Sequence, residues 1–138
     1  MRESMNVIVP SAVQMLEVAP YFLVPDVVAT SGHYRDVLGF SFDRYYGDPP
    51  SFCIVSRDGI ALMLKQAEGA ERQRCSAGSA PTVDAYIWVT DLAALAAELH
   101  DRGADIVTEP ASRSAYQGRE MHVRDLDGRI ICFGELDG

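Results

Sequence analysis

The chain has 138 residues, 48% of them hydrophobic, and a formal net charge of −8. A chain of this length and composition is expected to form one compact domain with a buried core. The acidic balance argues against nucleic acid as a partner, because phosphate groups require a basic surface, and the sequence contains no apolar run long enough to span a membrane.

In chain order, the first half predicts a strand, a helix and three further strands. A buried strand is expected over residues 16–24, where Pro20 indicates an edge position. Asp26 is suited to cap the helix, and Gly39 is suited to the position just after its end. The strands that follow the helix are expected over residues 40–46, 52–56 and 60–65.

The second half repeats this order after a stretch rich in Gly and Ser at residues 67–82. A strand is expected over residues 84–90, and Asp91 is suited to cap a helix that closes at Gly103. The later strands are expected over residues 105–109, 119–124 and 129–133, with a loop over residues 111–118. Strands grouped after each helix favour an α+β fold over a parallel α/β fold.

Cysteine usage and the N-terminus indicate the compartment. The three cysteines are odd in number and widely spaced, so neither a disulfide framework nor a zinc knuckle is predicted. Cys53 and Cys132 are interpreted as buried thiols. The first residues lack a secretory pattern, and a cytoplasmic location is expected.

The two halves share a recurring phrase, Val24-Pro25-Asp26-Val27 and Val89-Thr90-Asp91-Leu92, and each later carries an Asp-Gly turn. Two longer segments accompany these features: His33-Tyr34-Arg35-Asp36-Val37-Leu38-Gly39-Phe40 and Tyr116-Gln117-Gly118-Arg119-Glu120. Over about residues 17–135 the chain resembles the vicinal oxygen chelate superfamily, which includes glyoxalase I, extradiol dioxygenases, and fosfomycin and bleomycin resistance proteins.

The resemblance implies an α+β fold of two βαβββ modules that form curved mixed sheets around a cup. It places module one at about residues 15–66 and module two at about residues 83–135, joined by the linker at about 67–82 within a single domain of residues 1–138. Many members of the superfamily pair, so a homodimer is expected. The cup implies a small-molecule ligand as the other partner.

Metal-dependent members of the superfamily place a ligand on the first and last strand of each module. Counting seven residues back from the Asp of each helix cap, and aligning on the two Asp-Gly turns, gives four residues: Ala19, Met63, Asp84 and Cys132. Alanine has no ligand atom, and methionine and an apolar-strand cysteine suit Ni, Mn, Fe or Mg poorly. The sequence therefore predicts no metal here and no cofactor, which makes glyoxalase and dioxygenase chemistry unexpected.

The residues expected to line the cup are largely aromatic. If Asp84 points inward, strand alternation sends Tyr86 and Trp88 the same way. The metal-free branch that fits this pattern is the bleomycin resistance type, which holds a cationic planar drug between aromatic groups. The predicted ligand-binding residues are Phe52, Met63, Asp84, Tyr86, Trp88, Tyr116 and Cys132.

Each of these interpretations has an alternative. Tyr86 and Trp88 become core residues packed on the following helix if the strand presents its other face. An unpaired inward carboxylate is costly, so Asp84 binds a cation, pairs with Lys65 or an arginine, or lies at the wet mouth of the cup. Arg119 and Glu120 are interpreted as a structural ion pair or strand-end contact.

Three functions follow from these residues. The favoured one is a non-catalytic protein that binds a small hydrophobic or cationic aromatic compound, as in antibiotic sequestration. The alternative is a lyase or isomerase type of enzyme with metal-free or unusual catalysis, in which Asp84, His122 or Tyr116 acts as acid or base, although His122 is typical of a satisfied sheet histidine. The third is a structural or regulatory module whose cup is filled by its own side chains. No catalytic residue is assigned.

Overall fold

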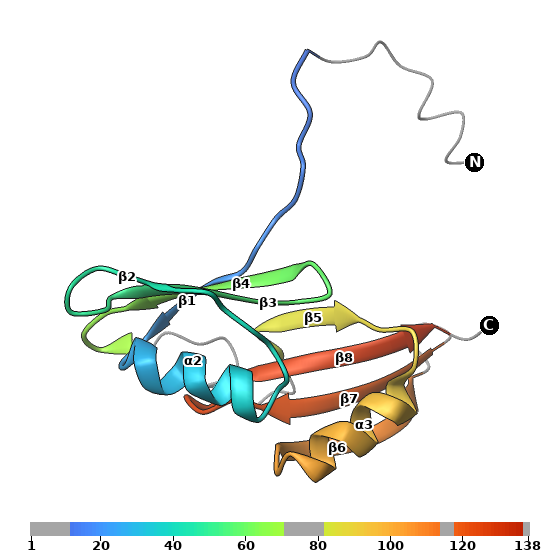
Figure 1. Cartoon of the computed structure of the whole chain (residues 1–138). Helices are drawn as coiled ribbons and strands as arrows, with labels where there is room; N and C mark the ends of the chain where they lie inside the picture. Colours follow the sequence, from blue (N-terminus) through green and yellow to red (C-terminus); the bar gives the residue numbers. More distant parts are fainter. Residues whose placement is uncertain (1–11, 71–81, 114–117, 137–138) are drawn as a thin grey trace.

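The computed structural model of the chain describes residues 12–70, 82–113 and 118–136 (Figure 1). Its first half contains strands β1 (Tyr21–Val24), β2 (Tyr45–Tyr46), β3 (Phe52–Arg57) and β4 (Ile60–Gln66), with helix α2 (Val27–Asp36) after β1. Its second half contains β5 (Ala85–Trp88), α3 (Leu92–Asp101), β6 (Asp105–Arg113), β7 (Gly118–Arg124) and β8 (Ile130–Leu136).

Each half forms its own four-stranded mixed sheet. The orders are β1-β4-β3-β2 and β5-β8-β7-β6. The first strand of each half runs parallel to the last, and the remaining pairs are antiparallel. The predicted α+β fold of two βαβββ modules is confirmed. No helix among the described residues is long and apolar enough to cross a membrane.

The strand boundaries differ most from the prediction in three places. β1 begins at Tyr21, and Pro20 contributes only a carbonyl acceptor to β4 because proline has no N–H. Ser41 pairs with Ser56 while Tyr45 pairs with Cys53. The segment 41–45 therefore has one residue more than the segment 53–56 opposite it, and the ladder of strand hydrogen bonds is interrupted between the two pairs. In the second half, β6 continues to residue 113, where a loop was expected.

The recurring phrase is the start of a helix in both halves. Asp26 Oδ1 accepts hydrogen bonds from the N–H groups of Val28 and Ala29, each at 3.1 Å. Asp91 Oδ1 accepts from the N–H of Ala94 at 3.0 Å. These carboxylates satisfy amide groups that have no partner within the helix, so both predicted caps are confirmed.

One hydrophobic core joins the two modules. Alternate residues of each sheet point toward its helix, and these inward residues form a single cluster with both helices. The sheets contribute Phe22, Val24, Cys53, Val55, Leu62, Leu64, Met121, Val123, Ile131 and Phe133. The other face of each sheet, the open face, turns away from this core.

The two modules also contact each other through their hairpin turns. The side chain of Arg57, before the β3–β4 turn, donates to both carboxylate oxygens of Glu98 on α3 at 2.9 and 2.7 Å. In the reciprocal contact, the β7–β8 turn meets α2: Thr30 Oγ1 donates to Asp127 at 2.6 Å, and Tyr34 donates to Asp125 at 2.7 Å. Each turn therefore contacts the helix of the other module.

The β7–β8 turn is the more deeply buried of the two. Arg129 is only 2% exposed, its guanidinium lies 4.7 Å from the centre of the Phe22 ring, and it donates to the carbonyl of Leu23. Asp125 Oδ1 accepts from the backbone N–H groups of residues 127 and 129, both at 2.9 Å. Burial raises the pKa of Asp125 above its ordinary value. A charged network thus lies inside the junction of the modules.

Replacing Arg57 with Met is expected to lower the free energy of unfolding by about 1 kcal/mol, because the ion pair with Glu98 is bidentate but about one-third exposed. The hydrogen bond from Arg57 lowers the pKa of Glu98. The stabilisation by the Arg57–Glu98 ion pair is therefore present above the ordinary glutamate pKa, and it is lost as pH falls through the lowered pKa of Glu98. Urea unfolding at several pH values measures this loss. Arg124→Met removes a more exposed pair with Asp105 and is the control, with a smaller expected effect.

Candidate functional site

The strand register of the second sheet aligns polar and aromatic side chains across its open face. Cys132 on β8 lies between Tyr86 on β5 and His122 on β7. In the next row, Gly134 lies between Trp88 and Glu120. Because these residues alternate with core residues along their strands, all the side chains among them lie on the face that turns away from α3.

Gly134 allows Tyr86 to lie flat across this face. A Cβ atom on Gly134 would lie only 2.8 and 2.9 Å from the ring atoms Cε1 and Cζ of Tyr86. The tyrosine hydroxyl reaches over this position and donates to Glu120 Oε2 at 2.8 Å. Trp88 packs beside Tyr86 with 4.7 Å between ring centres, and 54% of its surface is exposed. A glycine at this point of β8 thus sets the position of both rings.

Gly134→Ala is expected to destabilise the fold by about 1 to 2 kcal/mol, because a methyl group would overlap the Tyr86 ring and displace it. The displacement breaks the hydrogen bond to Glu120, so the environment of Trp88 changes as well. Thermal unfolding together with Trp88 fluorescence measures both effects. Gly59→Ala, at a turn glycine with open space around it, strains only the backbone; it should destabilise the fold but leave the fluorescence spectrum unchanged.

Three side chains with different ligand atoms converge beside Tyr86. One donor atom each from Glu120, His122 and Cys132 lies within 4.8 Å of the others. His122 Nε2 is 3.6 Å from Glu120 Oε1, and each of the two side chains is 14% exposed. Cys132 is fully buried. This face therefore combines a carboxylate, an imidazole and a thiol under a partial aromatic cover.

A second aromatic group lies on the open face of the first sheet. Phe52 has its ring centre 5.9 Å from that of Tyr21 and 5.8 Å from that of Tyr46. Met63 lies opposite Tyr21 in register, on the same face. The Arg44 guanidinium lies 6.0 Å from the centre of the Tyr46 ring. Three aromatic rings from three strands thus form one exposed patch.

Within one chain, the predicted ligand-binding residues fall into two groups. Phe52 and Met63 lie on the open face of the first sheet. The second sheet carries the other group, which is Asp84, Tyr86, Trp88 and Cys132. Tyr116 lies outside the described residues. Among the described residues, Tyr86 and Trp88 do not belong to the shared hydrophobic core, which favours the ligand-facing interpretation; that they contact a ligand stays a prediction.

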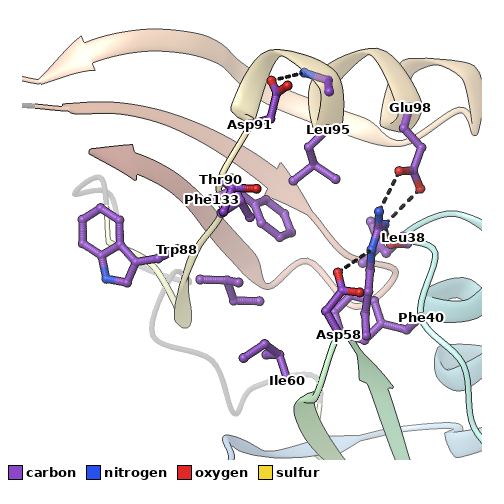
Figure 2. Close-up of a pocket in the computed structure, with 14 residues that line it drawn as sticks. Leu38, Phe40, Asp58, Ile60, Trp88, Thr90, Asp91, Leu95, Glu98 and Phe133 are labelled. Carbon is purple, nitrogen blue, oxygen red and sulfur yellow. Dashed lines mark hydrogen bonds and ion pairs between the residues drawn. The ribbon is translucent and has the colours of Figure 1, made fainter. Parts of the chain in front are cut away.

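A cavity of about 540 Å³ lies between the modules, beside the start of α3 and the β3–β4 turn. Of the predicted ligand-binding residues that the structure describes, only Trp88 lines it. Figure 2 shows Trp88 and Glu98 on opposite sides of this space, with Ile60 and Asp58 below them in the view. Apolar side chains line part of the cavity, and the Arg57–Glu98 ion pair lines another part.

The fold has close structural relatives. The bleomycin-binding protein from the bleomycin-producing Streptomyces verticillus, solved with copper(II)-bleomycin, is 28% identical, with a TM-score of 0.65 over 91% of this chain and 98% of that one. A glyoxalase-related enzyme from Clostridium phytofermentans is 17% identical, with a TM-score of 0.72 over 93% and 100% of the two chains. TioX from Micromonospora sp. ML1 is 18% identical, with a TM-score of 0.69 over 88% and 98%.

The chain has the vicinal oxygen chelate fold. The resemblance expected from the sequence is thereby confirmed. No protein-family model matches the chain, and no curated protein matches it. The similarity to known proteins therefore rests on the fold that these solved structures share with the chain.

The positions that hold metal in metal-dependent vicinal oxygen chelate proteins do not suit one here. Ala19 has no ligand atom, and Met63 offers only a thioether. The carboxylate of Asp84 accepts a hydrogen bond from the N–H of Ile130 at 2.9 Å and fixes the start of β8. A backbone amide is thus one partner of Asp84, and sequence reasoning did not consider it. The residues at positions 19, 63, 84 and 132 therefore do not fit the metal ion of those relatives.

Glu120 and His122 are the residues of this face that sequence reasoning assigned to structural roles. The available signal was the hairpin register: the turn at residues 125–128 places His122 opposite Cys132, and strand alternation places Glu120 on the same face. Tyr21 and Tyr46 of the first sheet were missed as well. Tyr46 belongs to β2, at the end of the strand expected over residues 40–46, but no place on the open face was predicted for it.

Proposed function

We propose that the protein binds a small hydrophobic or cationic aromatic compound on its aromatic open faces, without a metal held jointly by positions 19, 63, 84 and 132. The observation that carries the proposal is the pair Tyr86–Trp88, held in place on the open face of the second sheet rather than packed in the core. The 28% identical relative that binds bleomycin supports antibiotic sequestration as the biological form of this binding.

The chemistry of the faces suits a planar cation. Exposed aromatic rings attract cations because the ring faces carry negative electrostatic potential, and they stack on planar apolar groups. Glu120 lies beside the Tyr86 hydroxyl, and the net charge of −8 adds a long-range attraction for positive ligands.

A homodimer would complete the site. Each chain presents two separate aromatic faces that turn away from its own core, so a second copy can bring the first sheet of one chain to the second sheet of the other. Residues 12–20 extend away from the body of the chain (Figure 1), and their large apolar side chains are 76–101% exposed at Val13, Met15, Leu16 and Val18. A second copy would cover such a segment. The cytoplasmic location stays a prediction from the sequence.

Ligand titration tests the proposal. Trp88 is the only tryptophan of the chain, so its fluorescence reports directly on the second open face. Bleomycin and simple planar aromatic cations are expected to quench it saturably, and an uncharged compound of the same ring system is the matched control, with weaker binding. Equilibrium dialysis confirms stoichiometry. If none of the cations binds saturably by either method, sequestration of a cationic drug is ruled out.

The second candidate is an enzyme of the same fold, of the lyase or isomerase type. The specific observation in its favour is His122, whose Nε2 lies 3.6 Å from Glu120 on the same open face. A histidine beside a carboxylate is suited to moving a proton. Mass spectrometry of the compound recovered after incubation discriminates: sequestration returns it unchanged, whereas an enzyme converts it and His122→Gln abolishes the conversion.

A further inference from the structure

We propose that Glu120, His122 and Cys132 form a binding site for Zn²⁺ on the open face of the second sheet. The strands place these residues together: His122 and Cys132 are direct partners across β7 and β8, and Glu120 lies two residues before His122 on the same face. The three donor atoms already lie within 4.8 Å of one another. The site therefore depends on the sheet register and not on a loop.

The distances suit one small ion. Zinc bonds of about 2.0–2.3 Å in a tetrahedral arrangement place neighbouring donor atoms roughly 3.4–3.6 Å apart. His122 Nε2 and Glu120 Oε1 are 3.6 Å apart. All three donor atoms, Cys132 Sγ included, lie within 4.8 Å of one another, so a bound ion would draw them closer together. The side chains of Glu120 and His122 are mostly buried, but 14% of each is exposed. This exposed part leaves a route by which an ion can enter from solvent.

The donor set selects the metal. Thiolate, imidazole and carboxylate together are typical of zinc, whereas the hard ions Mg²⁺ and Ca²⁺ prefer sites made only of oxygen atoms. Three protein ligands leave a fourth position open for water or for a donor atom of a bound compound. The Tyr86 hydroxyl donates to Glu120 Oε2 at 2.8 Å, which orients the other oxygen of that carboxylate toward the histidine.

This site differs from the one that metal-dependent relatives use. Of its ligands, only Cys132 belongs to the four positions compared above, and both other ligands come from β7. The proposal does not rest on the binding of an aromatic compound. Because zinc binding is measured with the ion alone, either proposal can fail while the other holds.

Cobalt is the spectroscopic probe for the site. The full chain, purified in the presence of a chelator and then dialysed, is titrated with Co²⁺ and separately with Zn²⁺. We expect one equivalent to bind, with a thiolate-to-cobalt absorption band in the near ultraviolet and visible bands typical of tetrahedral coordination. Zinc should displace the cobalt and raise the temperature of thermal unfolding, since an ion that binds only the folded state stabilises it.

Substitutions locate the ion. Cys132→Ser should abolish the thiolate band, His122→Gln and Glu120→Gln should each weaken binding by at least about tenfold, and Tyr86→Phe should weaken it by about tenfold. The matched controls are Cys53→Ser, on the core face of β3, and His100→Gln, beside Glu109 on the surface; neither should change binding. Circular dichroism checks that each variant folds.

Two results would overturn the proposal. One is the absence of a stoichiometric cobalt complex with a thiolate band in the wild-type chain. The other is a complex that persists unchanged in folded Cys132→Ser or His122→Gln protein. Because Cys75 lies outside the described residues, all titrations are repeated in a Cys75→Ser background, where the wild-type spectrum must be retained.

Discussion

Asp125→Ala is expected to lower the free energy of unfolding by about 3 to 4 kcal/mol, because it removes a buried acceptor that three donors share. The Tyr34 hydroxyl and the backbone N–H groups of residues 127 and 129 all donate to this carboxylate at 2.7–2.9 Å. Asp125 is only 5% exposed, so water cannot replace it without opening the junction. Chemical denaturation measured by circular dichroism gives the loss.

Asp125→Asn is the matched control, because it keeps the shape and one acceptor oxygen. It should cost clearly less than the alanine variant, since the amide oxygen can still accept from both backbone N–H groups. The prediction fails if the two variants are equally destabilised, because the loss would then come from the charge and not from the shared acceptor.

The same residue gives stability a pH dependence. Burial raises the pKa of Asp125, whose titratable neighbours include Tyr34, Asp127 and His33. The folded state therefore holds this proton more tightly than the unfolded state does. The resulting stabilisation is complete below the ordinary aspartate pKa of about 4 and is lost as pH rises through the raised value. The stability of wild type relative to Asp125→Asn should fall across that window.

Local sequence signals predicted most of the fold. The Asp caps and the Asp-Gly turns act through hydrogen bonds and backbone angles within a few residues, and Asp58 and Gly59 adopt the positive φ values, 53° and 81°, that such a tight hairpin turn requires. Strand lengths depended on partners far away in the chain. Residues 40–46 read as a continuous strand, but their register with β3 shifts by one residue.

The candidate site was only partly predictable for the same reason. Alternation along β5 indicated that Tyr86 and Trp88 share a face, but the choice of face depended on packing against α3. Grouping His122 with Cys132 required the register of β7 and β8. The two modules share a core on their helix sides, so Phe52 and Trp88 lie on the open faces of different sheets within one chain. That one cup gathers the predicted aromatic residues stays a prediction.

Trp88→Ala is expected to weaken the binding of a planar aromatic cation by about 10- to 100-fold, because it removes both a stacking surface and a cation–π partner. The side chain is 54% exposed, so its removal should leave the fold intact. Trp88→Phe keeps an aromatic face and should lose less affinity. Because both variants lack the fluorescent reporter, equilibrium dialysis measures their binding.

Phe52→Ala provides the test of a site shared between subunits. Phe52 lies on the other sheet, beside Tyr21 and Tyr46, so a site shared between two copies predicts that this variant also weakens binding. If Phe52→Ala and Trp88→Ala chains are mixed and allowed to exchange, hybrid dimers contain one site with both changes and one intact site. Random exchange then restores wild-type affinity to roughly a quarter of the sites.

The mixing experiment separates the two arrangements because complementation requires two chains. If a single chain formed the whole site, every chain in the mixture would carry one defect, and no site of wild-type affinity would appear. A full-affinity fraction that grows with exchange time supports the shared site. Its absence in a mixture shown to contain hybrid dimers rules out the shared site. If Phe52→Ala alone also leaves the affinity unchanged, the ligand binds on the Tyr86–Trp88 face of one sheet.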